Sequence, residues 1–358
     1  TIAIVGPEAK SCVEKFFRPA TPRWPGENQM AFGHWREFGG EEVVVCLRQD
    51  DHCEVHCHGG IAAVAAILGD LREVGCDQEN NRRWIDRIAG DPIVAAAMEL
   101  LPNARTERTA AILLDQFNGA LSREIAAILV DVETNRLAVA GNRCKSLLST
   151  AQIGLHLTTP WKVVIAGRTN VGKSSLINAL VGYQRSITFD QPGTTRDLVS
   201  ANTSLDGWPV ELFDTAGLRA ARHAIETAGV ALAEQQLLAA EVRILVFDGS
   251  KLWSDRDQRL LSTWPGAVVA HNKCDLAKPD ENRPEGIDTC AINGDGVSRL
   301  ISEIVRQMIP RTTESGQPVL FTTHQVSCLQ AILDASRRDE PAAAMDACRE
   351  LRCSRTNV

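Results

Sequence analysis

The sequence lacks any run of about 18 uninterrupted apolar residues, which is the length that a membrane-spanning helix requires. Residues 1–6 also lack the basic region and the long apolar stretch of a secretory signal. Internal repeats and low-complexity tracts are missing as well. We therefore expect a cytoplasmic protein that has no membrane partner.

An excess of positive charge is also lacking, because 38 Lys and Arg stand against 45 Asp and Glu, for a formal net charge of -7. No global field therefore draws the chain onto nucleic acid, and charge gives no support to an RNA site. The cysteines are numerous but scattered. In a chain without a secretory signal we interpret them as reduced thiols and not as a disulfide framework.

The length of the chain suggests several domains. A sequence of 358 residues is too long for one small core, and two or three domains are expected. The hydrophobic fraction of 44% and the charged fraction of 23% are typical of an ordinary globular protein.

Residues 1–75 are predicted to form a small α/β domain. They carry three strand-like runs, Ile2–Val5, Glu42–Leu47 and Cys53–His58, followed by apolar residues at helical spacing over Ile61–Val74. The histidines and cysteines of the third run would suit zinc, but neighbours on one straight strand do not easily close a tetrahedral site. We therefore interpret that run as a strand.

The remainder of the chain alternates in character. Residues 76–157 show helical periodicity and predict the first part of a helical domain, with a hinge before Pro160. Residues 158–312 start with the apolar strand Val163–Ala166 and alternate strands with helices, which predicts a mostly parallel sheet with helices on both faces. Residues 313–358 return to helical patterning. The expected fold class is α/β, with this domain inserted in the helical domain.

A phosphate-loop motif, GRTNVGKS, lies between the strand Val163–Ala166 and a helical segment. Its glycines let backbone amides turn inward and form a nest for phosphate oxygens at a helix N-terminus. Lys173 is expected to act in catalysis by neutralising the β- and γ-phosphates, and Ser174 to offer its hydroxyl to Mg²⁺. A chance match on an ordinary strand–turn–helix unit is the simpler alternative. The residues expected to bind the nucleotide here are Asn170, Val171, Gly172, Lys173, Ser174 and Ser175.

Two further segments are predicted to respond to the third phosphate. Asp214 ends a hydrophobic strand in a D-x-x-G motif, where its carboxylate can hold Mg²⁺ and Gly217 can present its amide to the γ-phosphate. Thr195, in the segment GTTRD, is predicted to give Mg²⁺ a second hydroxyl. Any strand-to-turn junction can produce D-x-x-G, and an ordinary polar loop would also explain the segment around Thr195.

The sequence NKCD after a further apolar strand predicts recognition of guanine. Asp275 only accepts hydrogen bonds when ionised, so it requires two donors on one base edge, which guanine offers and adenine does not. Lys273 can lie against the base plane, while Asn272 braces the loops. The backbone amides expected to contact the base carbonyl are those of Cys290, Ala291 and Ile292. Together the motifs predict a phosphate-loop GTPase domain that hydrolyses GTP.

Leu218 occupies the position where one common GTPase design places a water-orienting glutamine, so hydrolysis requires another polar group. At this point the chain resembles the MnmE (TrmE) family of tRNA modification GTPases. The resemblance covers most of the chain and is densest over residues 160–230. It rests on Asn170, GTTRD at Gly193–Asp197, DTAGLR at Asp214–Arg219, Glu226, EVHCHGG at Glu54–Gly60 and FNGALS at Phe117–Ser122.

The resemblance implies hydrolysis that depends on K⁺, which supplies the charge that an arginine finger gives elsewhere, an effect worth roughly 10³–10⁵ in rate. It implies that Glu226 is catalytic and orients the attacking water through a bridging water; a solvated carboxylate near a helix start is the alternative. It also implies a homodimer activated by contact between two GTPase domains. The residues that match the family's K⁺ site are Asn170, Phe189, Gln191 and Thr194, of which Phe189 and Thr194 are also expected to contact the nucleotide.

The same resemblance implies a role in modifying the wobble uridine of tRNA, together with an MnmG-type flavoprotein. The family ends in Cys-x-Gly-Lys, whereas here Cys353 has no following Gly-Lys, and we interpret it as an ordinary thiol. The family's site for 5-formyltetrahydrofolate has an arginine where this chain has Ala3, and a lysine where none occurs between Lys15 and Lys145. Only Glu54 matches a folate-contacting carboxylate.

Two alternatives stay open. A divergent GTP-controlled switch, which hydrolyses GTP without taking part in tRNA modification, is favoured by the missing Cys-x-Gly-Lys. A ribosome-assembly GTPase is disfavoured, because no basic RNA-binding tail follows Pro310.

Overall fold

The computed structural model describes the chain except residues 38–39, 184–199, 215–234, 236, 277–279, 281, 311–313 and 353–358. The chain divides into two compact units, Thr1–Trp84 and Ile85–Val358. Across the described residues, no helix is long and apolar enough to cross a membrane.

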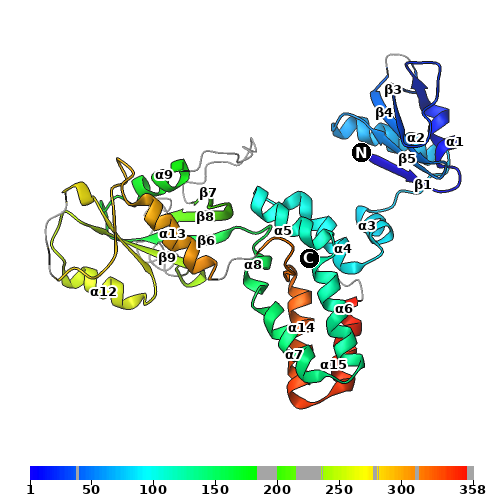
Figure 1. Cartoon of the computed structure of the whole chain (residues 1–358). Coiled ribbons are helices and arrows are strands. Elements are labelled where there is room, and N and C mark those ends of the chain that lie inside the picture. The colour runs from blue at the N-terminus through cyan, green and yellow to red at the C-terminus, as the bar shows by residue number, and fades with distance from the viewer. Residues whose placement is uncertain are drawn as a thin grey trace. The chain divides into compact units, whose positions relative to one another are not determined.

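The first unit is a five-stranded antiparallel sheet in the order β1-β5-β4-β3-β2 with two helices packed against it (Figure 1). Its elements are β1 (Ile2–Val5), α1 (Ala9–Phe16), β2 (Phe17–Pro19), β3 (Gln29–Trp35), β4 (Glu42–Gln49), β5 (His52–His56) and α2 (Ile61–Glu73). Alternate residues of β5 point to opposite faces, so Cys53 and Val55 are buried in the core while Glu54 and His56 are only half-buried. The predicted strand is confirmed and ends two residues earlier, at His56.

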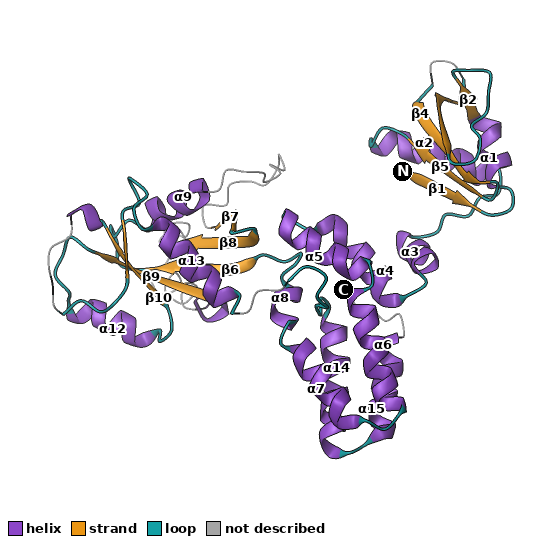
Figure 2. Cartoon of the chain, in the orientation of Figure 1, coloured by secondary structure: helices purple, strands orange, loops and turns teal. Residues whose placement is uncertain are grey.

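The second unit contains helices from both sides of the predicted insertion (Figure 2). Four of these helices form a bundle, in which α14 packs against α7 and α15, and α15 also packs against α6. These helices thus come from segments that are more than a hundred residues apart in sequence. Helix α3 (Asn81–Ala89) begins in the first unit and ends in the second. The helices of the second unit outside the inserted domain are α4 (Pro92–Leu100), α5 (Glu107–Phe117), α6 (Ala120–Glu133), α7 (Leu137–Leu148), α8 (Ala151–Leu155), α14 (Thr323–Arg338) and α15 (Pro341–Arg352).

Polar side chains fasten the returning segment before α14 to the earlier helices. Gln116 is fully buried; its amide donates to the carbonyl of Gln317 at 3.1 Å, and its oxygen accepts from the amide of Val319 at 3.2 Å. The hydroxyl of Thr150 accepts from the amide of Leu320 at 3.1 Å. These three backbone groups are therefore satisfied although residues 317–320 form no helix or sheet.

The inserted domain is built on a six-stranded sheet in the order β11-β10-β9-β6-β8-β7. All neighbouring pairs are parallel except β7 and β8, which form an antiparallel hairpin. The expected fold class, α/β with a mostly parallel sheet domain inserted in a helical domain, is thereby confirmed. The elements are β6 (Trp161–Ala166), α9 (Lys173–Tyr183), β7 (Ser200–Leu205), β8 (Trp208–Asp214), β9 (Val242–Asp248), α12 (Asp255–Thr263), β10 (Val268–Asn272), β11 (Ile287–Thr289) and α13 (Val297–Met308).

The central strands are buried on both faces, as the continuous apolar run in β6 predicts. Val163 and Ile165 belong to the core formed with α9 and α13, whereas Val164 and Ala166 belong to a second core with residues of α12 packed against it. Figure 1 shows α13 and α12 on opposite sides of the sheet. This alternation fixes the strand register and aligns the carboxyl ends of the strands along one edge.

The turn of the β7–β8 hairpin contacts the helical part of the same unit. The hydroxyl of Thr106, the N-cap of α5, donates to the carbonyl of Gly207 at 2.7 Å. Arg108 is ion-paired with Asp206 at 3.5 Å and lies over the ring of Trp208, 5.6 Å from its centroid. Asp206 and Gly207 both have positive φ, as a two-residue hairpin turn requires.

Replacing Gly154 by alanine should destabilise the second unit. A Cβ at Gly154 would clash with the backbone carbonyl of Leu320, which the returning segment cannot move without losing its bond to Thr150. We expect a loss of about 1–3 kcal/mol in the free energy of unfolding, measured by denaturant titration. Gly182→Ala is the matched control, because nothing lies within 4 Å of its Cβ position in α9. A loss in the control equal to that at Gly154 would contradict this explanation.

Candidate active site

The phosphate loop runs from the end of β6 to the start of α9 at Lys173. Asn170 and Gly172 adopt left-handed backbone conformations, with φ of 63° and 93°. A Cβ at Gly172 would clash with the side-chain amide of Asn272, so glycine is required by both its backbone angle and its close approach.

Lys173 is buried inside this loop. Its ammonium donates to the carbonyl oxygens of Gly167 at 3.0 Å and Arg168 at 2.7 Å. A buried ammonium needs such acceptors, and the same group can exchange carbonyl oxygens for phosphate oxygens when an anion enters the loop.

Two predicted magnesium ligands meet at the next strand end. The hydroxyl of Ser174, in the first turn of α9, donates to Asp214 Oδ2 at 2.7 Å, and Asp214 is the last residue of β8. Both side chains offer the hard oxygen atoms that Mg²⁺ prefers, so this pair fits that ion.

Asn272 joins three loops at the end of β10. Its side chain is buried; its amide donates to the carbonyl of Val171 at 2.9 Å, and its oxygen accepts from the amide of Ala291 at 3.1 Å. The hydroxyl of Thr289 approaches the same oxygen at 3.4 Å. This places the NKCD loop against the phosphate loop on one side and the loop after β11 on the other.

The residues predicted to contact the base lie at the rim of this arrangement. Asp275 is exposed in the single turn Cys274–Leu276, and Ile292 is 89% exposed. Cys290 is buried, and its amide, which was expected to contact the base, donates instead to the carbonyl of Asp295 at 2.8 Å. The site therefore has a braced interior and an open edge toward which a base can approach.

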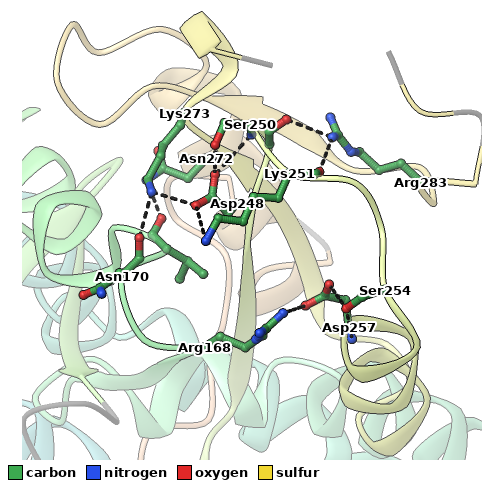
Figure 3. A network of polar contacts seen from close by, with 12 residues as sticks. Arg168, Asn170, Asp248, Ser250, Lys251, Ser254, Asp257, Asn272, Lys273 and Arg283 are labelled. Carbon is green, nitrogen blue, oxygen red and sulfur yellow. Dashed lines mark hydrogen bonds and ion pairs between the residues drawn. The ribbon is translucent and has the colours of Figure 1, made fainter. Parts of the chain in front are cut away.

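Asp248, which sequence reasoning missed, is the partner of Lys273 in this region (Figure 3). The Lys273 ammonium donates to Asp248 Oδ2 at 2.7 Å and to the Asn170 carbonyl at 2.8 Å. Burial alone would raise the pKa of the Asp248 carboxyl, but hydrogen bonds from Lys273 and Ser250 outweigh it and hold that pKa below 3.8. A carboxylate at the end of an apolar parallel strand, before Gly249, was the available signal.

A polar cavity of about 170 Å³ adjoins this network. His271 lines it and is buried; its Nε2 lies 2.9 Å from the carbonyl of Pro284, and burial lowers the pKa of the imidazole. Because a carbonyl only accepts, Nε2 carries a proton. Arg168 and Asp257 approach each other at 3.7 Å along the same wall.

Several predicted residues lie outside the described part of the chain. They are Phe189, Gln191, Thr194, Thr195, Gly217 and Glu226. Ser175 follows Ser174 in α9 and is exposed.

Comparison with known proteins agrees with this geometry. Residues 162–273 match the family model described as 50S ribosome-binding GTPase. The tRNA modification GTPase MnmE of Synechococcus sp. (strain JA-2-3B'a(2-13)) is 31% identical over 356 residues, covering 86% of this chain and 77% of that protein. The MnmE of Synechococcus sp. (strain CC9605) is 29% identical over 386 residues, covering 96% of this chain and 85% of that protein.

Among solved structures, the G domain of the T. maritima FeoB iron transporter is 23% identical, with a TM-score of 0.29. The match covers 41% of this chain and 98% of the FeoB chain.

Asn272→Asp should weaken the site even before nucleotide binds. The substitution places a carboxylate oxygen against the carbonyl of Val171, where an amide now donates, and leaves two acceptors facing each other in a buried position. We expect the free energy of unfolding without nucleotide to fall by about 1–3 kcal/mol, measured by denaturant titration. Asn103→Asp, at an exposed position, is the control. Equal stability of both variants would show that this bond does not hold the loops together.

Proposed function

The chain belongs to the MnmE family of tRNA modification GTPases and hydrolyses GTP, and we propose that it does so with Mg²⁺ and K⁺ in the service of tRNA modification. The observation that carries the proposal is the meeting of Ser174, Asp214 and Asn272 around the phosphate loop. In parallel α/β sheets, ligands bind beyond the carboxyl ends of the strands, which is where these side chains lie.

The phosphate loop would bind the triphosphate through its backbone amides and Lys173. The ammonium leaves the carbonyls of Gly167 and Arg168 and bridges the β- and γ-phosphates, so its positive charge stays buried and partnered. Ser174 and Asp214, with Thr195, would hold Mg²⁺, which neutralises charge on the phosphate oxygens when bound. The 2.7 Å contact between the first two supports this assignment.

The base would bind between Lys273 and the loop after β11. Asp275 accepts from the ring N–H and the exocyclic amine of guanine, and its exposed position leaves the carboxylate accessible to a base edge. Adenine has an acceptor at the corresponding ring position, so two acceptors would face each other without a hydrogen bond between them. Asn272 sets the spacing of both loops. The amides of Cys290 and Ala291 already donate to Asp295 and Asn272, so the base carbonyl would be met by the amide of Ile292.

Water activation would rest on Glu226 and on K⁺, because Leu218 cannot form a hydrogen bond. We propose that the Asn170 side chain, with Phe189, Gln191 and Thr194, holds K⁺ beside the phosphates. The match of these residues to the family's K⁺ site supports this.

Activation would follow homodimerisation through the GTPase domains, and the partners would be tRNA and an MnmG-type flavoprotein. We propose no 5-formyltetrahydrofolate site. The matching carboxylate, Glu54, is ion-paired with Arg48 at 3.1 Å and approaches His56 at 3.3 Å.

GTP turnover should be faster in K⁺ than in Na⁺ at equal ionic strength, by on the order of 10-fold or more. Asn170→Gly isolates the cause, because glycine keeps the left-handed backbone while removing the side-chain ligand. This variant should bind GDP but lose the preference for K⁺. Equal rates of the wild type in both salts, measured as phosphate release, would rule out the K⁺ mechanism.

Glu226→Ala should lower the hydrolysis rate by roughly 100-fold or more, as expected for loss of a group that positions the water. Its affinity for GTP should stay within a factor of about two, because no nucleotide contact is removed. Single-turnover hydrolysis and equilibrium binding measure the two quantities separately. Glu285→Ala, an exposed glutamate of the same domain, is the control. An unchanged rate in Glu226→Ala would show that this carboxylate is merely solvated and takes no part in hydrolysis.

A further inference from the structure

Lys273 is held at its charged end by two acceptors from different loops. Its ammonium lies 2.7 Å from Asp248 Oδ2 at the end of β9 and 2.8 Å from the carbonyl of Asn170 in the phosphate loop. Its backbone is left-handed, with φ of 64°. The four-carbon stem is therefore fixed at both ends between the base loop and the phosphate loop (Figure 3).

Asp248 is itself fixed by its surroundings. Its side chain is only 7% exposed, and its second oxygen accepts from the amide of Ser250 at 3.1 Å and from the hydroxyl of Ser250 at 2.6 Å. Lys251 approaches the same carboxylate at 3.8 Å, but its side chain is 70% exposed. The carboxylate thus has one closely held cation, Lys273, and one solvated neighbour.

We propose that Asp248 is a positioning residue for the purine base and that it acts through Lys273. The inference rests on the proposed assignment of Asn272, Lys273 and Asp275 to the base site. A lysine stem is flexible, and ordering it when a nucleotide binds costs conformational entropy. The carboxylate orders that stem beforehand, so the base meets a flat apolar surface that is already in place.

The proposal separates two parts of base recognition. The stem of Lys273 packs against the plane of any purine and contributes to affinity without reading the edge. Asp275 reads the edge and contributes to discrimination. Loss of Asp248 should therefore weaken guanine and hypoxanthine nucleotides by the same factor and leave their ratio unchanged.

The contact with Asn170 extends the effect to the phosphate loop. The backbone of Asn170 is left-handed, with φ of 63°, a conformation that asparagine adopts more readily than most residues. The Lys273 ammonium holds the carbonyl of this residue. When Asp248 is absent, the Lys273 ammonium keeps only the Asn170 carbonyl as an acceptor and can turn toward solvent.

A structural role for Asp248, limited to the turn at Ser250, predicts a different result. In that case its removal would act independently of Lys273, and the effects of the two substitutions would add. The coupling between the effects of the two substitutions therefore distinguishes the two roles of Asp248.

The test is a double-mutant cycle on nucleotide affinity. The dissociation constants of GDP and IDP are measured by calorimetry for the wild type, Asp248→Ala, Lys273→Ala and the double variant. We expect Asp248→Ala to raise both constants by roughly 5- to 20-fold. In the Lys273→Ala background, the same substitution should change them less than about twofold. Additive effects, or a change confined to one nucleotide, would overturn the proposal.

Two controls keep the result interpretable. Lys251→Ala, which removes the exposed neighbour of the same carboxylate, should leave both constants unchanged. Asp248→Asn keeps the shape of the side chain and should reproduce the loss if Asp248→Ala folds poorly. Wild-type affinity in Asp248→Asn would also overturn the proposal, because the charge would then be unnecessary.

Asp275→Asn distinguishes this inference from the base-site assignment beneath it. An asparagine amide can donate to the second carbonyl of xanthine, so this variant should exchange a preference for GDP for one for XDP. If base preference does not change, the assignment of the base site fails. If it changes while Asp248→Ala binds GDP normally, only the role of Asp248 fails.

Discussion

The side chain of Asn272 is the contact on which the arrangement of the site depends. It donates to the carbonyl of Val171 and accepts from the amide of Ala291, so one buried amide sets the spacing of the phosphate loop and the loop after β11. Each of these loops follows a different strand of the mostly parallel sheet. Because a buried amide must satisfy both its donor and its acceptor, the three loops can close in few ways.

The insertion into the helical domain is stabilised by a similar use of polar groups. Residues 314–321, which lead back to the helices after the GTPase domain, form no helix or strand, and buried backbone there requires partners. Gln116 satisfies both a carbonyl and an amide of that segment, and Thr150 satisfies a third group. The bundle of α6, α7, α14 and α15 is thereby completed by helices from both ends of the insertion.

Much of the fold and the motif positions could be predicted from sequence, because these features are local. The strand before the phosphate loop is a continuous apolar run. The glycine spacing that identifies the loop is also what lets its backbone amides turn toward a phosphate. The elements α1, β2 and β3 were missed: α1 and β2 are short, and the apolar residues of β3 do not alternate regularly with polar ones. Asp248 was missed because its role comes from a lysine 25 residues away that only the folded sheet brings near. Glu226, Thr195 and Gly217 remain predictions.

The β7–β8 hairpin has a mechanical consequence. Its turn is fastened to α5 through Thr106 and Arg108, and β8 ends at Asp214, the carboxylate beside Ser174. A paired strand of this length extends over roughly 20 Å, and its length changes very little. A displacement of Asp214 along that axis must therefore be taken up at the turn or passed to the helices. The helical part of the unit is thus joined to the carboxylate of Asp214 by a paired strand and not by a flexible linker.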